Sequence, residues 1–289
     1  MRLFFLALSL VLLASCGQNT SKVDAGDDTT KVITQVLAEQ SDEVKARFVY
    51  RHPAETLAFF EITPGSTVVE ALPGGGWYSK ILLPIVGPNG QLVGADYAYE
   101  MWKKFGFFDD KFLEARKTWT TSWPQETKDW GIPNSATTSA ILLGAVPEEL
   151  KATADTVLFI RALHNLARFE KDGGYLTAAL ASAYDVLKPG GIVGVVQHQA
   201  REAMPDEWAS GQNGYLKKSF VIAQMEQAGF EFVADSAMNE NPKDQPTTAD
   251  VVWRLPPTMY ATQDKPELKA AMLEIGESNR MTLKFRKPE

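Results

Sequence analysis

The stretch from residue 68 to residue 82 restricts the fold of this chain more than any other. A run of β-branched residues ends at Glu70, three consecutive glycines follow at 74–76, and an apolar periodic segment begins at Trp77. Consecutive glycines let the backbone adopt positive φ and let a ligand approach without meeting a Cβ atom. The free N–H groups at the start of the next helix then point toward that ligand. The stretch therefore predicts a strand, a tight turn and a helix that together bind a nucleotide-like ligand.

The rest of the chain alternates between strand-like and helix-like segments. Strands are predicted at 91–95, 138–143, 155–161, 192–196, 230–233 and 281–286, with helices at 77–86, 175–187 and 215–229. Such alternation is typical of a parallel sheet covered by helices on both faces. The chain has 289 residues, 45% of them hydrophobic, which is enough for one large core. We predict a single α/β domain over residues 31–289, with N-terminal helices and excursions near 97–131 and 239–278.

The beginning of the chain has the features of a targeting segment. A positively charged start, Met1-Arg2, precedes an apolar run at 3–13, so residues 1–15 are predicted to be a signal peptide. Its end, Leu13-Ala14-Ser15-Cys16, resembles the lipobox of bacterial lipoproteins, in which the cysteine becomes the lipidated first residue. Cys16 is also the only cysteine, so the mature chain has no disulfide and no thiolate ligand for a metal.

Two other interpretations of this segment are an ordinary signal peptide with a chance cysteine and an uncleaved anchor. The apolar run is shorter than the roughly 20 residues that a membrane-spanning helix needs, which argues against the anchor. Gly17 follows the cysteine, and by resemblance to Gram-negative sorting rules this indicates the periplasmic face of the outer membrane. Residues 16–30 are polar and are predicted to be a flexible tether, so that the membrane is contacted through the lipid alone.

Asp96 stands at the end of the second predicted strand, about 20 residues after the glycines. In a nucleotide-binding βαβ unit this spacing lets a carboxylate accept hydrogen bonds from a ribose diol. An isolated aspartate at such a place is more often a turn residue or a helix cap. Because Asp96 is paired with the glycine turn, the ribose interpretation is favoured.

Four features of the sequence, in their order along the chain, resemble those of the class I S-adenosylmethionine-dependent methyltransferases. They are the Glu70–Gly76 turn, Asp96, the strand that leads from Asp155 to His164-Asn165, and the Lys188-Pro189-Gly190-Gly191 turn before the fifth strand. More narrowly, Pro73–Tyr78, His198 and the closing Lys287-Pro288 resemble a group of bacterial predicted methyltransferases with no settled substrate. The resemblance implies a Rossmann-like, seven-stranded, mostly parallel sheet whose last strand, 281–286, is antiparallel and lies beside strand six.

The resemblance also implies positions for the methyl donor. Glu70, Gly74, Gly75 and Gly76 would approach the amino-acid end of its methionine moiety, Asp96 its ribose and Tyr97 its adenine. One departure is that Leu72 stands where the family pattern has its first glycine, so the turn is expected to differ locally. The glycines also nearly fit the NAD fingerprint, and the later Lys-Pro-Gly-Gly turn and terminal strand favour S-adenosylmethionine over NAD.

The segment 97–131 is unusually rich in aromatic side chains, and two interpretations of it stay open. Aromatics at mixed spacing can form a satellite core under a long excursion. They can also form a lid or substrate wall next to Asp96. The residues concerned are Tyr97, Tyr99, Trp102, Phe105, Phe107, Phe108, Phe112, Trp119, Trp123 and Trp130.

Two of the three histidines are candidates for catalysis. His164 and His198 follow the fourth and fifth predicted strands, at the carboxyl edge where open α/β sheets bind ligands. A histidine there can accept the proton that an oxygen or nitrogen acceptor loses. His52, next to a proline, is interpreted as structural. Asn165 could orient an acceptor or cap the following helix, and capping is favoured. No metal site is predicted, because the sequence has no His-x-x-x-His pair and no acidic triad at ligand spacing.

Taken together, these features predict a lipid-anchored, S-adenosylmethionine-dependent methyltransferase of the bacterial envelope. Its acceptor would be a small or envelope-associated molecule, and the sequence indicates no oligomeric state. The net charge of −7 argues against a nucleic acid as partner. Because the methyl donor is made in the cytoplasm, a second hypothesis is a non-catalytic, ligand-binding envelope lipoprotein that retains the fold. A third is an NAD-dependent Rossmann oxidoreductase.

Overall fold

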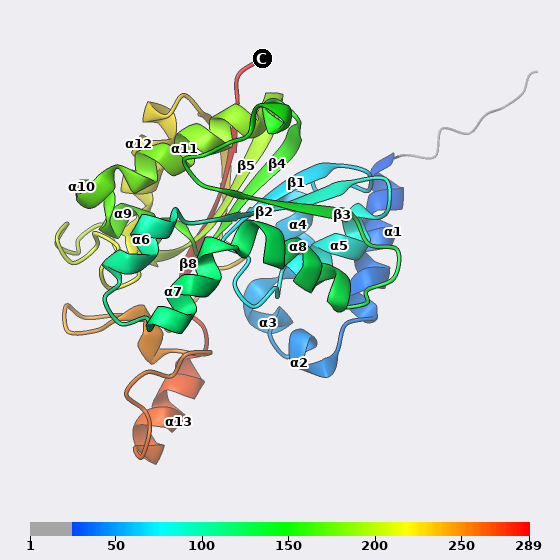
Figure 1. The fold of residues 1–289 in the computed structure, drawn as a ribbon. Coiled ribbons are helices and arrows are strands. Elements are labelled where there is room, and N and C mark those ends of the chain that lie inside the picture. The colour runs from blue at the N-terminus through cyan, green and yellow to red at the C-terminus, as the bar shows by residue number, and fades with distance from the viewer. Residues whose placement is uncertain (1–24) are drawn as a thin grey trace, which may run out of the picture.

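The computed structural model describes residues 25–289 (Figure 1). The predicted signal peptide and Cys16 lie outside the described residues. The expected N-terminal helices are α1 (Ala25–Ala38), α2 (Asp42–Lys45), α3 (Phe48–Arg51) and α4 (Pro53–Phe59). Helix α1 begins within the segment that the polar composition had assigned to the tether. Pro53 occupies the first turn of α4, where its missing N–H would be unpaired in any case.

The centre of the molecule is a single mixed sheet in the order β3-β2-β1-β4-β5-β8-β7. The strands are β1 (Thr67–Ala71), β2 (Gln91–Asp96), β3 (Thr137–Leu142), β4 (Ala154–Ile160), β5 (Leu187–Ala200), β7 (Glu231–Ser236) and β8 (Arg280–Arg286). The first five strands in this order, β3, β2, β1, β4 and β5, pair in parallel. Strand β8 runs antiparallel to both β5 and β7. This confirms the predicted seven-stranded sheet and the placement of its last strand.

Helices cover both faces of the sheet because alternate residues of each buried strand point to opposite sides. Val68 packs with α1, α4, α5 (Ser79–Val86) and α8 (Trp119–Asp129). Its neighbour Val69 packs with α6 (Tyr99–Lys104), α9 (Leu163–Arg168), α11 (Tyr175–Val186) and α12 (Lys218–Gln227). Figure 1 shows these two helical layers on either side of the strands. Nearly continuous burial of β1, β2, β4 and β5 explains why their sequences are apolar rather than alternating.

Two local predictions differ from the structure. The Lys188–Gly191 turn lies inside β5, at a register shift between the pairs Ala154–Leu187 and Thr156–Ile192. Gly190 keeps a turn-like φ of +74° there, so the turn survives as an irregularity in a continuous strand. The helix expected from Tyr215 starts at Lys218, because Leu216–Lys217 form a short strand, β6, beside the end of β5.

The two excursions flank the carboxyl edge of the sheet. The first contains α6, α7 (Asp110–Lys117) and α8, and the second contains α13 (Pro266–Ile275). The remaining short elements are α10 (Glu170–Gly173) and two 3₁₀ turns at 148–150 and 252–254. Among residues 25–289, no helix has the length and apolar character required to cross a membrane.

Candidate functional site

The turn between β1 and α5 keeps a glycine-like backbone although it has lost one glycine. Leu72 has a φ of +54°, in the left-handed region that L-residues with a side chain rarely adopt, and Gly74 and Gly76 have φ of +58° and +75°. A leucine in this conformation costs about 1–2 kcal/mol relative to the right-handed region. The departure at residue 72 also places a leucine side chain in the lining of the cavity above the turn.

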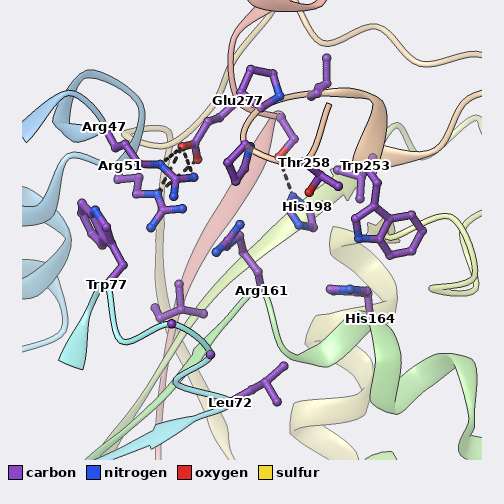
Figure 2. A pocket seen from close by; sticks show the side chains of 18 of the residues that line it. Arg47, Arg51, Leu72, Trp77, Arg161, His164, His198, Trp253, Thr258 and Glu277 are labelled. Carbon is purple, nitrogen blue, oxygen red and sulfur yellow. Dashed lines mark hydrogen bonds and ion pairs between the residues drawn. The ribbon is translucent and has the colours of Figure 1, made fainter. Parts of the chain in front are cut away.

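That cavity has a volume of about 470 Å³ and lies at the carboxyl ends of β1, β4 and β5 (Figure 2). Residues 72–75 of the glycine turn form its floor, and α3 and the segments 252–258 and 277–278 form its other walls. Its lining side chains include Glu43, Arg47, Arg51, Leu72, Trp77, Arg161, His164, Asn165, His198, Trp253, Glu277 and Ser278.

Both predicted histidines line this cavity, with ring centroids 5.5 Å apart. The Nδ1 atom of His164 pairs with the Gln197 side chain at 3.4 Å, and that of His198 pairs with the Ser278 hydroxyl at 2.5 Å. Burial lowers the pKa of His164 to about 4. Burial and the nearby His164 also hold the pKa of His198 well below its ordinary value. Both rings are therefore neutral at pH 7, and each is a weaker base than a free imidazole.

Three arginines that the sequence analysis did not single out share the same cavity. Arg47 and Arg51 come from the start and end of α3, and Arg161 follows β4. Burial, then repulsion from Arg161, lowers the pKa of Arg51 to about 9, and burial lowers the pKa of Arg161 to about 10. Arg51 also lies 4.4 Å from the ring centre of Trp77.

Glu277 is the buried acid that faces these arginines. It forms ion pairs with Arg47 at 2.5 Å, Arg51 at 3.3 Å and Arg280 at 3.1 Å. Burial opposes ionisation of Glu277, but Arg280, Arg51 and Arg47 together hold its pKa below the ordinary value. The segment that carries Glu277 is thereby fixed against the N-terminal helices.

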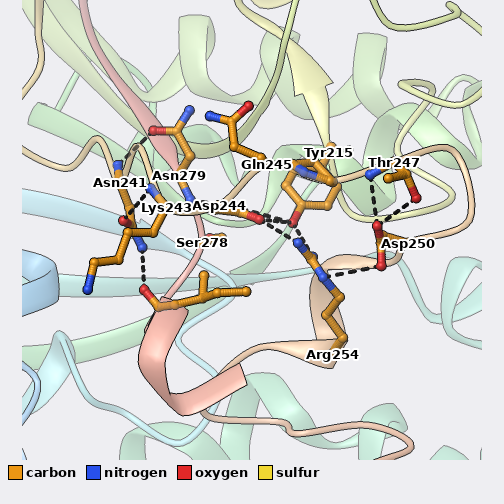
Figure 3. Close-up of polar contacts among 12 residues, drawn as sticks. Tyr215, Asn241, Lys243, Asp244, Gln245, Thr247, Asp250, Arg254, Ser278 and Asn279 are labelled. Atoms are coloured by element: carbon orange, nitrogen blue, oxygen red, sulfur yellow. Dashed lines mark hydrogen bonds and ion pairs between the residues drawn. The ribbon is translucent and has the colours of Figure 1, made fainter. Parts of the chain in front are cut away.

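A second polar network anchors the same segment from the other side (Figure 3). The buried carboxylate of Asp244 accepts hydrogen bonds from the Tyr215 hydroxyl at 3.0 Å, Arg254 at 2.7 Å and the Asn279 backbone N–H at 3.0 Å. The Asn241 amide donates to the backbone carbonyl of Glu277 at 2.6 Å. These contacts hold the second excursion over the sheet edge, so that Ser278 reaches His198.

The predicted donor-binding residues divide into two groups. The backbone of Gly74 and Gly75 lines the cavity, whereas Gly76 faces Trp130, whose ring would lie 2.5 Å from an added Cβ. Glu70 is 3% exposed and lies behind the turn, where it accepts a hydrogen bond from the Ser79 hydroxyl at 2.6 Å. Burial raises the pKa of Glu70 to about 7 although that hydrogen bond opposes the shift.

Asp96 is 1% exposed, and the protein itself occupies both of its oxygens. One accepts from the backbone N–H of Tyr97 at 2.8 Å, and the other accepts from Trp102 Nε1 at 3.3 Å and Arg116 at 3.1 Å. Burial raises the pKa of Asp96 despite the attraction of Arg116. Tyr97 is fully buried and donates its hydroxyl hydrogen to the carbonyl of Ala162 at 2.8 Å. Neither side chain lines the cavity.

The aromatic excursion forms a satellite core, and part of it also lines a second cavity. Its use as a lid or substrate wall stays a prediction. Trp119 and Trp123 pack under β2, where Gly94 leaves room for the Trp123 ring. Trp102, Phe105 and Phe108 pack on the other core and also line a second cavity of about 630 Å³. This second cavity shares Asn165, Trp253 and Thr258 with the first.

No protein-family model and no curated protein sequence matches this chain, but solved structures do. The [4+2]-cyclase SpnF is similar over 90% of this chain and 93% of its own, at 15% identity and a TM-score of 0.52. A chain of the Haloferax volcanii complex between the methyltransferase activator Trm112 and its methyltransferase-like partner matches over 90% of this chain and 98% of its own, at 13% identity and a TM-score of 0.51. A SAM-dependent methyltransferase from Aquifex aeolicus covers 70% of this chain and 90% of its own, at 16% identity and a TM-score of 0.46.

Together with the strand order, the likenesses to SpnF and to the Haloferax volcanii chain decide the fold. It is the class I methyltransferase fold. At such low identity the likeness extends to the fold alone, and a cyclase among the neighbours illustrates that one fold hosts more than one chemistry. What the chain does must therefore be argued from its own cavity.

Proposed function

We propose that the protein is an S-adenosylmethionine-dependent methyltransferase. The observation that carries this proposal is that the glycine turn, His164 and His198 meet at one cavity. The cavity lies outside the carboxyl ends of parallel strands, where open α/β sheets bind ligands. In a turn of this kind, backbone N–H groups can approach the methionine end of the donor closely, because Gly74 and Gly75 present no side chain.

The remaining parts of the donor fit the site with one rearrangement. The aromatic wall of the second cavity, formed by Trp102 and Phe105, is suited to stacking a purine ring. Asp96 can accept from a ribose only if Trp102 and Arg116 release its carboxylate. We therefore propose that α6 and α7 shift when the donor binds.

In the proposed reaction a histidine accepts the proton that the methyl acceptor loses. When bound, the donor supplies a methyl group on a sulfonium, and its carbon–sulfur bond breaks as a lone pair of the acceptor forms the new bond. An O–H or N–H acceptor then loses a proton, which a neutral histidine accepts at Nε2. Among residues 25–289, neither His164 nor His198 has a hydrogen-bond partner at Nε2, so this atom is available to the acceptor.

Calorimetry on the full chain with S-adenosylhomocysteine tests the proposal. We expect saturable binding that Asp96→Ala weakens about tenfold or more, since a hydrogen bond to a charged group contributes roughly 1.5–3 kcal/mol. Asp206→Ala is the matched control, because its carboxylate is 93% exposed and lies away from the cavity lining. No binding to S-adenosylhomocysteine, together with binding to NAD, would overturn the proposal and favour the oxidoreductase.

The occupied state of Asp96 also supports a second candidate, a ligand-binding protein that retains the fold without catalysis. Envelope extracts incubated with the full chain and methyl-labelled donor distinguish the two. Label transfer that His164→Ala and His198→Ala abolish supports the enzyme. Donor binding without label transfer, unaffected by either substitution, supports the binding protein.

For the location we propose anchoring in the cell envelope through a lipid on Cys16, on the periplasmic face of the outer membrane. The support is the Leu13–Cys16 sequence and the apolar run before it. Growth of producing cells with a radioactive fatty acid should label the protein, and Cys16→Ala should remove the label. Persistent labelling of the variant would contradict the anchor.

A further inference from the structure

The first cavity contains more buried positive charge than the protein neutralises. Arg51 is 1% exposed, Arg280 lies directly behind the wall at 3%, and Arg161 is mostly buried, whereas Glu277 is the buried acid among them. Arg47 adds a fourth guanidinium that is 24% exposed. Glu43 also lines the cavity, but it is exposed at the mouth, where water screens its charge. Buried charges of one sign are costly unless a partner of the other sign is supplied.

Arg51 and Arg161 each have a buried donor atom that lacks a partner within residues 25–289. Arg51 uses Nε to bind Glu277, while its Nη2 atom is buried and has no hydrogen-bond partner within residues 25–289. Arg161 has a buried Nε without a partner and forms no ion pair in that part of the chain. Figure 2 shows both guanidinium groups pointing into the middle of the cavity, with Arg161 between Arg51 and His198. Buried polar groups are normally satisfied, so such atoms mark a place where the acceptor comes from outside the chain, from a ligand or from water.

The methyl donor does not supply enough negative charge. S-adenosylmethionine carries a sulfonium and an ammonium against one carboxylate, so its binding adds net positive charge to the cavity. We infer that the methyl acceptor carries an oxyanion group, a carboxylate or a phosphate, that binds between Arg51 and Arg161. This inference rests on the proposed function, because it assigns the acceptor of that reaction.

The geometry fits this assignment. A guanidinium offers a planar fork of N–H donors that matches the paired oxygens of a carboxylate or phosphate. An oxyanion held by Arg161 would leave the rest of the acceptor beside His198, where the proton is to be removed. Its negative charge would also offset the positive field of Arg161, which contributes to lowering the pKa of both histidines.

Titration calorimetry with inorganic phosphate and with acetate, at constant ionic strength, tests the inference on the full chain. We expect saturable binding of at least one of these probes. Arg161→Gln should weaken it about tenfold or more. Arg286→Gln, whose side chain is 40% exposed on β8, should leave it unchanged. If Arg161→Gln does not fold by circular dichroism, Arg161→Lys replaces it and should weaken binding about threefold or more, because it loses the fork.

Each contrary result overturns the inference. No saturable binding of either anion to the wild-type chain would do so, and so would equal binding by the folded Arg161 variant. The titration is then repeated with saturating S-adenosylhomocysteine, which carries the donor carboxylate. If the anion still binds, the arginines belong to the acceptor site. If S-adenosylhomocysteine displaces the anion, the arginines bind the donor carboxylate, and the inference is overturned while the proposed function stands. If S-adenosylhomocysteine does not bind but the anion does, the proposed function fails and the cavity belongs to an anion-binding protein.

Discussion

Replacing Glu70 by glutamine should stabilise the protein at neutral and alkaline pH. The folded structure raises the pKa of this carboxyl from 4.5 to about 7, chiefly through burial. Between these values the unfolded chain is ionised while the folded chain holds the proton, so stability falls as the pH rises from about 4.5 to about 7 and then levels off. At 1.36 kcal/mol per pKa unit, the rise from 4.5 to about 7, a difference of about 2.5, makes the loss at most about 3.4 kcal/mol. Glutamine avoids it, because its amide stays neutral and can keep the hydrogen bond to Ser79.

The wild-type pH profile alone would hide this effect. His164, whose pKa falls from 6.5 to about 4, contributes stability that is present above pH 6.5 and is lost as the pH falls toward 4. The two groups therefore act in opposite directions over nearly the same range. The informative quantity is the difference in unfolding free energy between Glu70→Gln and the wild type.

Urea denaturation from pH 4 to pH 8.5 measures that difference. We expect it to be near zero at pH 4, to grow through pH 6 and to reach a plateau above pH 7. Glu231→Gln is the control, since its carboxylate is exposed on β7 and the substitution should change stability little at any pH. A Glu70→Gln chain that is less stable than the wild type at pH 8, or equally stable throughout, would refute the claim that burial keeps this carboxyl protonated up to neutral pH.

Three further predictions concern Arg116, Gly94 and His164. Arg116→Gln removes the cation that competes for Asp96, so S-adenosylhomocysteine should bind up to about tenfold more tightly by calorimetry; unchanged or weaker binding would contradict that competition. Gly94→Ala should destabilise the protein by about 1–3 kcal/mol in urea, because the new Cβ would lie 2.8 Å from the Trp123 ring. Gly75→Ala, with no atom within 4 Å of its added Cβ, is the matched control and should stay within about 0.5 kcal/mol of the wild type. The imidazole of His164 should stay neutral down to about pH 4 in an NMR titration, and a midpoint near its ordinary value of 6.5 would show that water reaches the ring.

Much of the fold could be predicted because its signals are local. The β-branched runs, the turn at 87–90 and the glycines at 74–76 each determine structure over a few residues, and their order along the chain determines the sheet. The irregularity in β5 was not predicted, because it depends on residues that are distant in the sequence. Whether Lys188–Gly191 ends a strand or interrupts one depends on pairing with Ala154 and Thr156, which lie far away in the sequence.

The site was predicted less completely because its decisive contacts join distant segments. His164 and His198 could be placed at one edge, since both follow strands of the same parallel sheet. The arginine cluster could not be predicted from the sequence. Arg51, Arg161 and Glu277 come together only when α3, the end of β4 and the second excursion are folded against one another. The one sequence signal was Arg51 beside His52-Pro53, and by itself that pattern predicts only the start of a helix.

Residues whose conformation or buried charge is unfavourable are concentrated at the carboxyl edge of the sheet. Leu72 has a φ typical of glycine, and Glu70 is buried with a pKa of about 7. Arg51 is buried and Arg161 is mostly buried, and each has a lowered pKa. Natural sequences tend to retain such conflicts where function requires them. A chain that had kept only the fold would be expected to relax such conflicts, for example by a glutamine at 70. Their coincidence with the glycine turn and both histidines supports the proposal that the cavity binds a charged ligand.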